Sequence, residues 1–352
     1  MAALRPIAIL SGQAGQRLIL AAAVFALAFG LSSARIGHGA PDFYVFWTAA
    51  QHWRTPYDPA IIAQLEASLR LAGTWPFAYP PTFLLAAWPF AQLPLTLAYP
   101  LWTGLETGLF VYAASHVVKP LWATAALVVC PIVFFAAELG QTSLLVGAAV
   151  VAGWRWREAR PVLAGVLFGL AACLKPQAMI MAPLVLWGRW RMLGWMLAAG
   201  AALVAASLVF GLQRWLEWPH ALAAFHALVP QTDRINPSAL IAAPWWAGLM
   251  ALLGVALAVR SRDLVGLVGG AMCVSPYAHA YDLAPLAPLA AAWLFDRARH
   301  GWGRAICGGA LLAGLVATPA AALAFFAAQA ALGVRWRPAR PASEPAPAPS
   351  PG

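Results

Sequence analysis

A carboxylate stands where the first long apolar run of this chain ends. Asp42 opens the stretch DFYVFWTAA, so that five bulky residues follow it directly. A positioned carboxylate can take the proton of an alcohol while a new bond forms to the alcohol oxygen, which contributes roughly 10²- to 10⁴-fold in rate. Asp is also favoured at the start of a helix, where its carboxylate accepts hydrogen bonds from backbone N–H groups. The position of Asp42 therefore predicts either a general base or a helix cap.

A lysine lies at a turn between two short apolar segments. Lys175, one of only two lysines in the chain, stands in ACLKPQAM, where Pro176 ends the preceding helix. A fixed ammonium beside a phosphate stabilises the charge that develops on a leaving group, most strongly where water is excluded. A lysine close to a membrane surface can instead extend its side chain towards water. We expect Lys175 either to bind a phosphate, assisted by Gln177, or to extend towards water.

A histidine and an aspartate stand three residues apart in SPYAHAYDLAP. If this segment is helical, His279 and Asp282 face the same cavity. His279 would then donate a hydrogen bond to a phosphate oxygen, and Asp282 would orient its ring. The pair could instead form only a structural hydrogen bond, so both interpretations stay open.

Other polar residues could line the same site. The motif ELGQTSLL supplies Glu138, Gln141 and Thr142, which could also hydrogen-bond neighbouring helices. Glu106 lies well within an apolar span, where pairing between helices is expected rather than catalysis. Tyr79 precedes two prolines and could serve only to shape the segment that follows. The candidates for the substrate pocket are Tyr79, Glu138, Gln141, Gln177, Tyr277 and Asp282.

The apolar segments around these residues place the chain in a membrane. The chain has 352 residues, of which 62% are hydrophobic and 10% charged, and apolar runs recur from Leu18 to about Ala331. No soluble core needs that much apolar surface. The net charge of +10 comes from basic residues scattered between these runs, which indicates loop charge rather than a nucleic-acid-binding face. We expect an all-α polytopic membrane protein whose first apolar stretch is an uncleaved helix.

No metal and no cofactor are expected. The four cysteines are not accompanied by any short Cys or His spacing, and each lies in a different apolar segment: Cys130, Cys173, Cys273 and Cys307. They are interpreted as small core residues.

Eleven spans are predicted, several of them too short to cross a membrane alone. They cover roughly residues 18–34, 97–117, 121–137, 141–154, 161–174, 177–188, 192–211, 240–259, 264–275, 283–295 and 305–330. Residues 82–90 lie between prolines and are predicted to be re-entrant, because a crossing there would break the bias of basic loops towards the cytoplasm. With that choice, 13 of the 22 basic residues face the cytoplasm: Arg5, Arg17, Lys119, Arg155, Arg157, Arg160, Arg189, Arg191, Arg260, Arg262, Arg297, Arg299 and Arg304.

Three outward turns are predicted to meet at one recessed site. They cover residues 138–141, 174–177 and 275–282, and the short spans beside them draw these turns below the outer surface. The site would therefore collect Gln141, Lys175 and His279 on the side that the first loop also faces.

The chain is predicted to form one transmembrane domain over residues 1–334, with about 11–12 helices. Residues 35–81 are the first extracytoplasmic loop. In that loop, one helix face is apolar and is expected to lie in the membrane interface: Phe43, Phe46, Trp47 and Ala50. The Pro- and Ala-rich residues 335–352 are predicted to be a disordered tail.

Six motifs together resemble glycosyltransferase family 87, a group of polyprenyl-phosphate-dependent membrane enzymes with a multi-helix superfold of the glycosyltransferase C type. They run in order through most of the chain, from about Arg35 to Pro288: DFYVFWTAA, YDP, YPPTFLL, ELGQTSLL, AGVLFGLAACLKPQ and SPYAHAYDL. The characterised members of that family are mannosyltransferases. The resemblance implies a sugar donor carried on a polyprenyl phosphate, a membrane-associated lipid or glycan acceptor, inversion at the sugar, and neither nucleotide nor catalytic metal.

The resemblance also implies roles for three residues. Asp42 matches the acidic residue that serves the family as base, while Lys175 and His279 match positions expected around the donor phosphate. The active site would face the extracytoplasmic side of the plasma membrane. The sequence QHWRTP before Tyr57 departs from the family pattern, so the identity of the acceptor does not follow from the resemblance.

Two other classes of function remain open at this point. A lipid-linked sugar flippase or other transporter would also need many spans, although the two halves of the chain hold no matched pair of broken helices. A non-catalytic assembly subunit of an envelope pathway is the third alternative.

Overall fold

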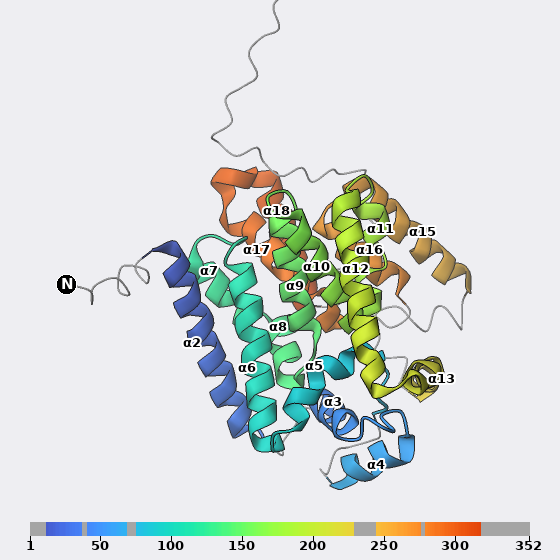
Figure 1. Ribbon diagram of the computed structural model, residues 1–352. Coiled ribbons are helices and arrows are strands. Elements are labelled where there is room, and N and C mark those ends of the chain that lie inside the picture. Colours follow the sequence, from blue (N-terminus) through green and yellow to red (C-terminus); the bar gives the residue numbers. More distant parts are fainter. Residues whose placement is uncertain (1–11, 37–40, 69–74, 229–243, 276–278, 318–352) are drawn as a thin grey trace, which may run out of the picture.

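The computed structural model describes residues 12–36, 41–68, 75–228, 244–275 and 279–317 (Figure 1). Within these ranges every regular element is a helix, so the prediction of an all-α chain is confirmed. Residues 335–352 and Tyr277 lie outside the described residues. The single domain over residues 1–334 and the disordered tail stay predictions.

Two helices in the described part of the chain are long and apolar enough to cross a membrane. They are α2 (Gln13–Ala34) and the continuous run of α12 (Trp190–Ser207) with η3 (Leu208–Phe210). A third candidate is bent by 59° between Leu121–Val129 and Pro131–Leu139. These two or three spans indicate a membrane protein, and the larger count of 11–12 helices crossing it stays a prediction.

Most of the other predicted segments are helical with ends shifted by a few residues; the last helix begins eight residues before the predicted 305, and residues 318–330 of that predicted span lie outside the described residues. The helices are α6 (Leu95–Ala114), α9 (Ser143–Trp156), α10 (Pro161–Leu174), α15 (Pro244–Ser261), α16 (Leu264–Val274), α17 (Ala287–Phe295) and α18 (Arg297–Ala317). Three of them, α9, α10 and α16, have 14, 14 and 11 residues and are short for a crossing.

Prolines break two segments that were predicted to be continuous. The segment 121–137 consists of α7 (Leu121–Ala126), η1 (Leu127–Val129) and α8 (Pro131–Leu139). Cys130 is extended there, with ψ 122°, because the ring of a following proline disfavours helical backbone. The segment 177–188 is likewise only η2 (Pro176–Met179) and α11 (Ala182–Val185), since Pro183 cannot donate the hydrogen bond that a continuing helix needs.

The first loop gathers at one end of the bundle. It contains α3 (Pro41–Gln51) and α4 (Pro59–Ser68), which lie with the following helix α5 (Pro81–Ala91) near the C-terminal end of α2, and α13 (Leu212–Leu228) is close by (Figure 1). At 11 residues with Pro89 inside, α5 is too short to span a membrane. Its re-entrant path stays a prediction.

The apolar face of α3 was expected to lie in the membrane interface, but it is buried against protein instead. Phe43 and Phe46 are 1% and 2% exposed and pack against Tyr99, Phe83 and Trp102 of α5 and α6. The helix was predicted correctly, but the face that was assigned to lipid is covered by protein. Asp42 is therefore held by a helix that packs within the bundle rather than by one that lies on the membrane surface.

Basic residues cluster at the opposite end of the bundle. Arg17 lies 3.1 Å from Nδ1 of His116, and Arg155 donates to the backbone oxygen of His116 at 3.3 Å. Arg189 pairs with Glu158 at 2.7 Å. The predicted cytoplasmic loops thus share one end, which separates them from the first loop.

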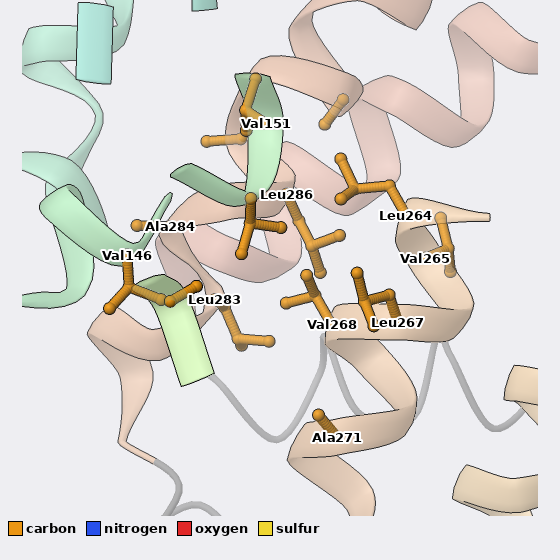
Figure 2. Packing of buried hydrophobic residues seen from close by; sticks show 14 of the residues in the cluster. Val146, Val151, Leu264, Val265, Leu267, Val268, Ala271, Leu283, Ala284 and Leu286 are labelled. Atoms are coloured by element: carbon orange, nitrogen blue, oxygen red, sulfur yellow. The ribbon is translucent and has the colours of Figure 1, made fainter. Parts of the chain in front are cut away.

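The core beside the site joins α9, α16 and η5 (Ala280–Leu286). In Figure 2, Leu264, Val265, Leu267, Val268 and Ala271 of α16 lie with Leu283, Ala284 and Leu286 of η5, and with Val146 and Val151 of α9. This packing holds η5 against the N-terminal end of α9, which places Asp282 beside Ser143.

Candidate active site

One cavity collects most of the predicted site residues. Its volume is about 390 Å³, and its polar lining comes from α3, the segment before α5, the turn between α8 and α9, the turn after α10 and the start of η5: Asp42, Tyr79, Gln141, Lys175, Gln177, His279 and Tyr281. The rest of the lining is largely apolar and includes Trp218 and Leu222 of α13. The turns at 138–141, 174–177 and 275–282 therefore do contribute residues to one cavity, as predicted.

Gly140 sets the direction of the turn that carries Gln141. It ends α8 with φ +62°, a left-handed conformation that glycine adopts without steric cost. A side chain here would also collide with α3, because a Cβ atom would lie 2.6 Å from Cβ of Phe43. Trp102 fixes the turn by donating to the Gly140 oxygen at 2.9 Å. The turn thus presses Gln141 against the first turn of α3, where Asp42 lies.

The side-chain amide of Gln141 links the Asp42 carboxylate to the Lys175 ammonium. Its Nε2 donates to Oδ2 of Asp42 at 2.8 Å and to the Tyr281 hydroxyl at 3.2 Å. Its Oε1 accepts from the Tyr79 hydroxyl at 3.1 Å and from Nζ of Lys175 at 3.5 Å. Both donors and both acceptor sites of the amide are therefore used, which fixes the side chain between Asp42 and Lys175.

Lys175 is buried rather than extended towards water. Its residue is 5% exposed, and its ammonium pairs with Oδ1 of Asp282 and donates to Oγ of Ser143 at 2.9 Å. Ser143 in turn donates to the same Asp282 oxygen at 2.7 Å. The ammonium also lies 4.8 Å from the centre of the Tyr281 ring. These partners offset the cost of burying the charge, which would be large for an unpaired ion.

Asp282 anchors its own segment instead of serving only the His279 ring. His279 precedes η5, and its backbone N–H donates to Oδ2 of Asp282 at 3.1 Å. The His279 ring stacks on the Tyr281 ring with 5.0 Å between centres. The segment is helical as predicted, in the form of a 3-10 helix. The Asp282 carboxylate, which was expected to orient the His279 ring, is instead bound by Lys175, Ser143 and the His279 backbone N–H.

Asp42 is half-buried at the cavity wall, outside the predicted spans. Burial in this largely apolar wall raises its pKa from 3.8 to about 6. The hydrogen bond from Gln141 and the charge of Lys175 lower the pKa in part, and the charge of Asp282 raises it further. Near neutral pH such a carboxylate is ionised yet basic enough to accept a proton.

Three acids do not line this cavity, and one of them is Asp282, which was predicted to face the same cavity as His279 but lines a separate small one. Glu138 pairs with Arg35 and lines a separate cavity beside α2, so the structure does not bring it to the cavity that holds Gln141 and Lys175. The left-handed turn at Gly140 separates it from Gln141. Glu106 is 1% exposed, and its carboxyl oxygens have no hydrogen-bond partner among the described residues. The interhelical pairing that was expected for Glu106 is therefore not formed there.

Two residues of the polar cluster were not singled out from the sequence. Ser143 follows Thr142 in ELGQTSLL, and Tyr281 precedes Asp282 in SPYAHAYDL. Each stood beside a chosen candidate, but a serine and a tyrosine carry no charge that would mark them in an apolar segment. Among the residues that the structure describes, no group of three His, Cys, Asp or Glu is placed to hold a metal ion.

The comparisons with known proteins give one match. Residues 77–280, more than half of the chain, match the family model described as Glycosyltransferase family 87. That range contains Tyr79, Gln141, Lys175 and His279, while Asp42 lies before it. A search of curated proteins and a search of solved structures found no match.

Proposed function

The chain belongs to glycosyltransferase family 87, and from this premise we propose that it transfers a hexose from a polyprenyl-phosphate donor to a membrane-associated acceptor. Mannose is the sugar that the family resemblance favours. The observation that carries the proposal is the single amide of Gln141, which contacts Asp42 on one side and Lys175 on the other within one cavity.

Asp42 acts as the general base in this proposal. It takes the proton of the acceptor hydroxyl while the acceptor oxygen bonds to the anomeric carbon of the sugar. The bond from that carbon to the phosphate oxygen breaks, and its electron pair leaves with the polyprenyl phosphate. Because the acceptor attacks from the face opposite the phosphate, the configuration at the anomeric carbon inverts.

Lys175 and His279 bind the departing phosphate. A phosphate monoester is a stable leaving group, so cationic and hydrogen-bonding donors suffice without a general acid. Of the contacts of the Lys175 ammonium, the one to Gln141 is the longest at 3.5 Å. A phosphate oxygen replaces this contact most readily, while Asp282 and Ser143 keep the ammonium in place.

The test uses purified protein, a radiolabelled polyprenyl-phosphate mannose and a membrane lipid extract. Transfer of label to a new lipid product, identified by mass spectrometry, is the expected result. Movement of the labelled lipid between leaflets of a vesicle without a new glycosidic bond would favour the flippase. Full function in cells after both Asp42→Asn and Lys175→Ala would instead favour an assembly subunit.

The proposed site faces the extracytoplasmic side of the plasma membrane. The separation of the first loop from the cluster of Arg17, Arg155 and Arg189 supports this orientation, because basic loops favour the cytoplasm. Reporter fusions at Arg157 and Trp218 should therefore report the inside and the outside, respectively. A result that places the reporter at Trp218 in the cytoplasm would contradict this orientation.

A further inference from the structure

Tyr281 places a hydroxyl group between the proposed base and the proposed phosphate-binding cation. The hydroxyl oxygen lies 3.2 Å from Nε2 of Gln141, and the same nitrogen donates to Asp42. The Lys175 ammonium lies 4.8 Å from the centre of the tyrosine ring. Tyr281 is only 8% exposed, yet it lines the polar cavity. Its hydroxyl therefore lies close to both groups that the proposed reaction uses.

The Tyr281 hydroxyl accepts a hydrogen bond but donates none within the described part of the chain. Gln141 donates to its oxygen, so the proton of the hydroxyl is left for another partner. Buried polar groups are nearly always hydrogen-bonded, and a buried donor of this kind needs an explanation. The cavity that Tyr281 lines has a volume of about 390 Å³ and can hold a substrate that accepts this hydrogen bond.

Contacts on the tyrosine ring fix the position of this hydroxyl. The His279 ring stacks on it, with 5.0 Å between centres and 18° between planes. The Phe135 ring of α8 lies 6.3 Å away. The next residue, Asp282, ties η5 to Lys175 and Ser143. A donor that is fixed in this way does not need to reorganise when negative charge develops in front of it, which favours stabilisation of a transition state.

We propose that the Tyr281 hydroxyl donates a hydrogen bond to the bridging oxygen of the donor, the oxygen that joins the sugar to the phosphate. The proposal rests on the proposed function and adds a neutral donor to the two groups that bind the phosphate. In the proposed reaction, Asp42 contacts the acceptor and Lys175 contacts the phosphate. The bridging oxygen lies between these two contacts, as the Tyr281 hydroxyl does.

The hydrogen bond from Tyr281 becomes stronger as the reaction proceeds. When the bond from the anomeric carbon to the bridging oxygen breaks, the electron pair stays on that oxygen, and hydrogen bonds to charged acceptors are stronger than those to neutral ones. Tyr281 keeps its proton throughout, since the polyprenyl phosphate leaves as an anion and the proton of the acceptor hydroxyl goes to Asp42. The contact therefore lowers the barrier more than it tightens binding of the donor.

The first test compares the polyprenyl-phosphate sugar with an analogue in which sulfur replaces the bridging oxygen. Tyr281→Phe keeps the ring and removes the hydroxyl. With the oxygen donor, single-turnover transfer at saturating donor should be about 10²-fold slower in this variant than in the unaltered protein, which is a usual cost of losing one preorganised donor. Sulfur is a weak hydrogen-bond acceptor, so with the sulfur donor the two proteins should differ by less than about threefold.

Tyr112→Phe is the matched control for this substitution. Tyr112 lies on α6 at the opposite end of the bundle, with its ring 5.0 Å from that of His116. This variant should transfer from both donors at the rates of the unaltered protein. If Tyr281 served only to position Gln141, Tyr281→Phe would slow both donors by the same factor and would shift the acid limb of the pH profile. Either result would overturn the contact with the bridging oxygen.

The second test measures binding and needs no transfer. The oxygen that bridges to the sugar in the donor is charged in free polyprenyl phosphate, so the hydrogen bond from Tyr281 should be stronger to the free phosphate. Tyr281→Phe should therefore raise the Kd of polyprenyl phosphate about tenfold more than the Kd of the sugar donor, which corresponds to about 1.4 kcal/mol. Equal changes in the two constants would contradict the proposal.

The outcomes separate this inference from the proposed function. Transfer by Tyr281→Phe at the rate of the unaltered protein would remove Tyr281 from the reaction and leave the glycosyltransferase proposal intact. A selective loss of polyprenyl-phosphate binding in a protein that transfers no sugar would support the contact between Tyr281 and this oxygen and would overturn the proposed function.

Discussion

Asp42 and Asp282 face the same polar cluster from two different elements, but their partners differ. Asp282 accepts from the Lys175 ammonium, the Ser143 hydroxyl and the His279 backbone N–H. Asp42 accepts from Gln141, its one side-chain donor within the described part of the chain. A carboxylate surrounded by donors holds structure together, whereas a carboxylate that lines a cavity, with a single side-chain donor among the described residues, can accept a proton. In the proposed mechanism, Asp42 therefore takes part in the chemistry and Asp282 supports the structure around it.

The largest expected effect on stability and transfer comes from breaking the buried ion pair between Lys175 and Asp282, which tests the comparison of the two acids. Lys175→Met leaves the Asp282 carboxylate without its cation, which costs about 3–5 kcal/mol of folding free energy. We expect a lower melting temperature in detergent and loss of transfer. The double variant Lys175→Met with Asp282→Leu should regain part of the melting temperature but not the transfer, because no unpaired charge is then buried, while the phosphate-binding cation and the hydrogen bonds of Asp282 to Ser143 and His279 are missing.

Lys119 supplies the matched control for this pair of variants. It is the other lysine of the chain and is exposed at the opposite end of the bundle. Lys119→Met should change neither quantity. Unchanged melting temperature in the single Lys175→Met variant would show that the pair does not hold the fold.

A smaller effect is expected in the pH dependence of transfer. Asp42 must be ionised to act as a base, so kcat/KM should fall as the pH drops through about 6, the value to which burial raises its pKa. Gln141 lowers that pKa through its hydrogen bond, and Gln141→Leu should therefore move the acid limb to higher pH. A limb near pH 4 in the unaltered protein, or a shift to lower pH in the variant, would assign the base to another group.

The smallest effect concerns Glu106, a buried acid to which no residue in the described part of the chain donates a hydrogen bond. Because no described residue donates to its oxygens, Glu106→Gln removes no hydrogen bond between protein groups. The melting temperature and the transfer rate should both stay at the level of the unaltered protein. By contrast, Asp282→Asn should lower the melting temperature, and equal effects of the two substitutions would remove the distinction between a paired and an unpaired buried acid.

The sequence predicted which residues line the cavity wherever a local turn signal accompanies them. Lys175 beside Pro176 and His279 before Asp282 carry their own turn signals, and both lie in the cavity. Glu138 and Gln141 could not be separated in this way. They are three residues apart, and only the left-handed turn at Gly140 shows that they lie on different cavities.

Burial could not be read from apolar patterning in a membrane protein. Phe43 and Phe46 form the same stripe whether a helix faces lipid or protein, and contact with Tyr99, Phe83 and Trp102 decides the matter. The pairing of Lys175 with Asp282 could not be predicted from the sequence either, since the two residues are 107 positions apart in the chain. Long-range packing, rather than local propensity, selects these contacts.

The most direct test of the central claim measures donor binding and single-turnover transfer on the same sample of Asp42→Asn. The substitution keeps the size of the side chain and removes its basicity. Binding of the polyprenyl-phosphate donor should persist, while the rate of transfer at saturating donor should fall by roughly 10²- to 10⁴-fold. Transfer by Asp42→Asn at the rate of the unaltered protein would contradict the account.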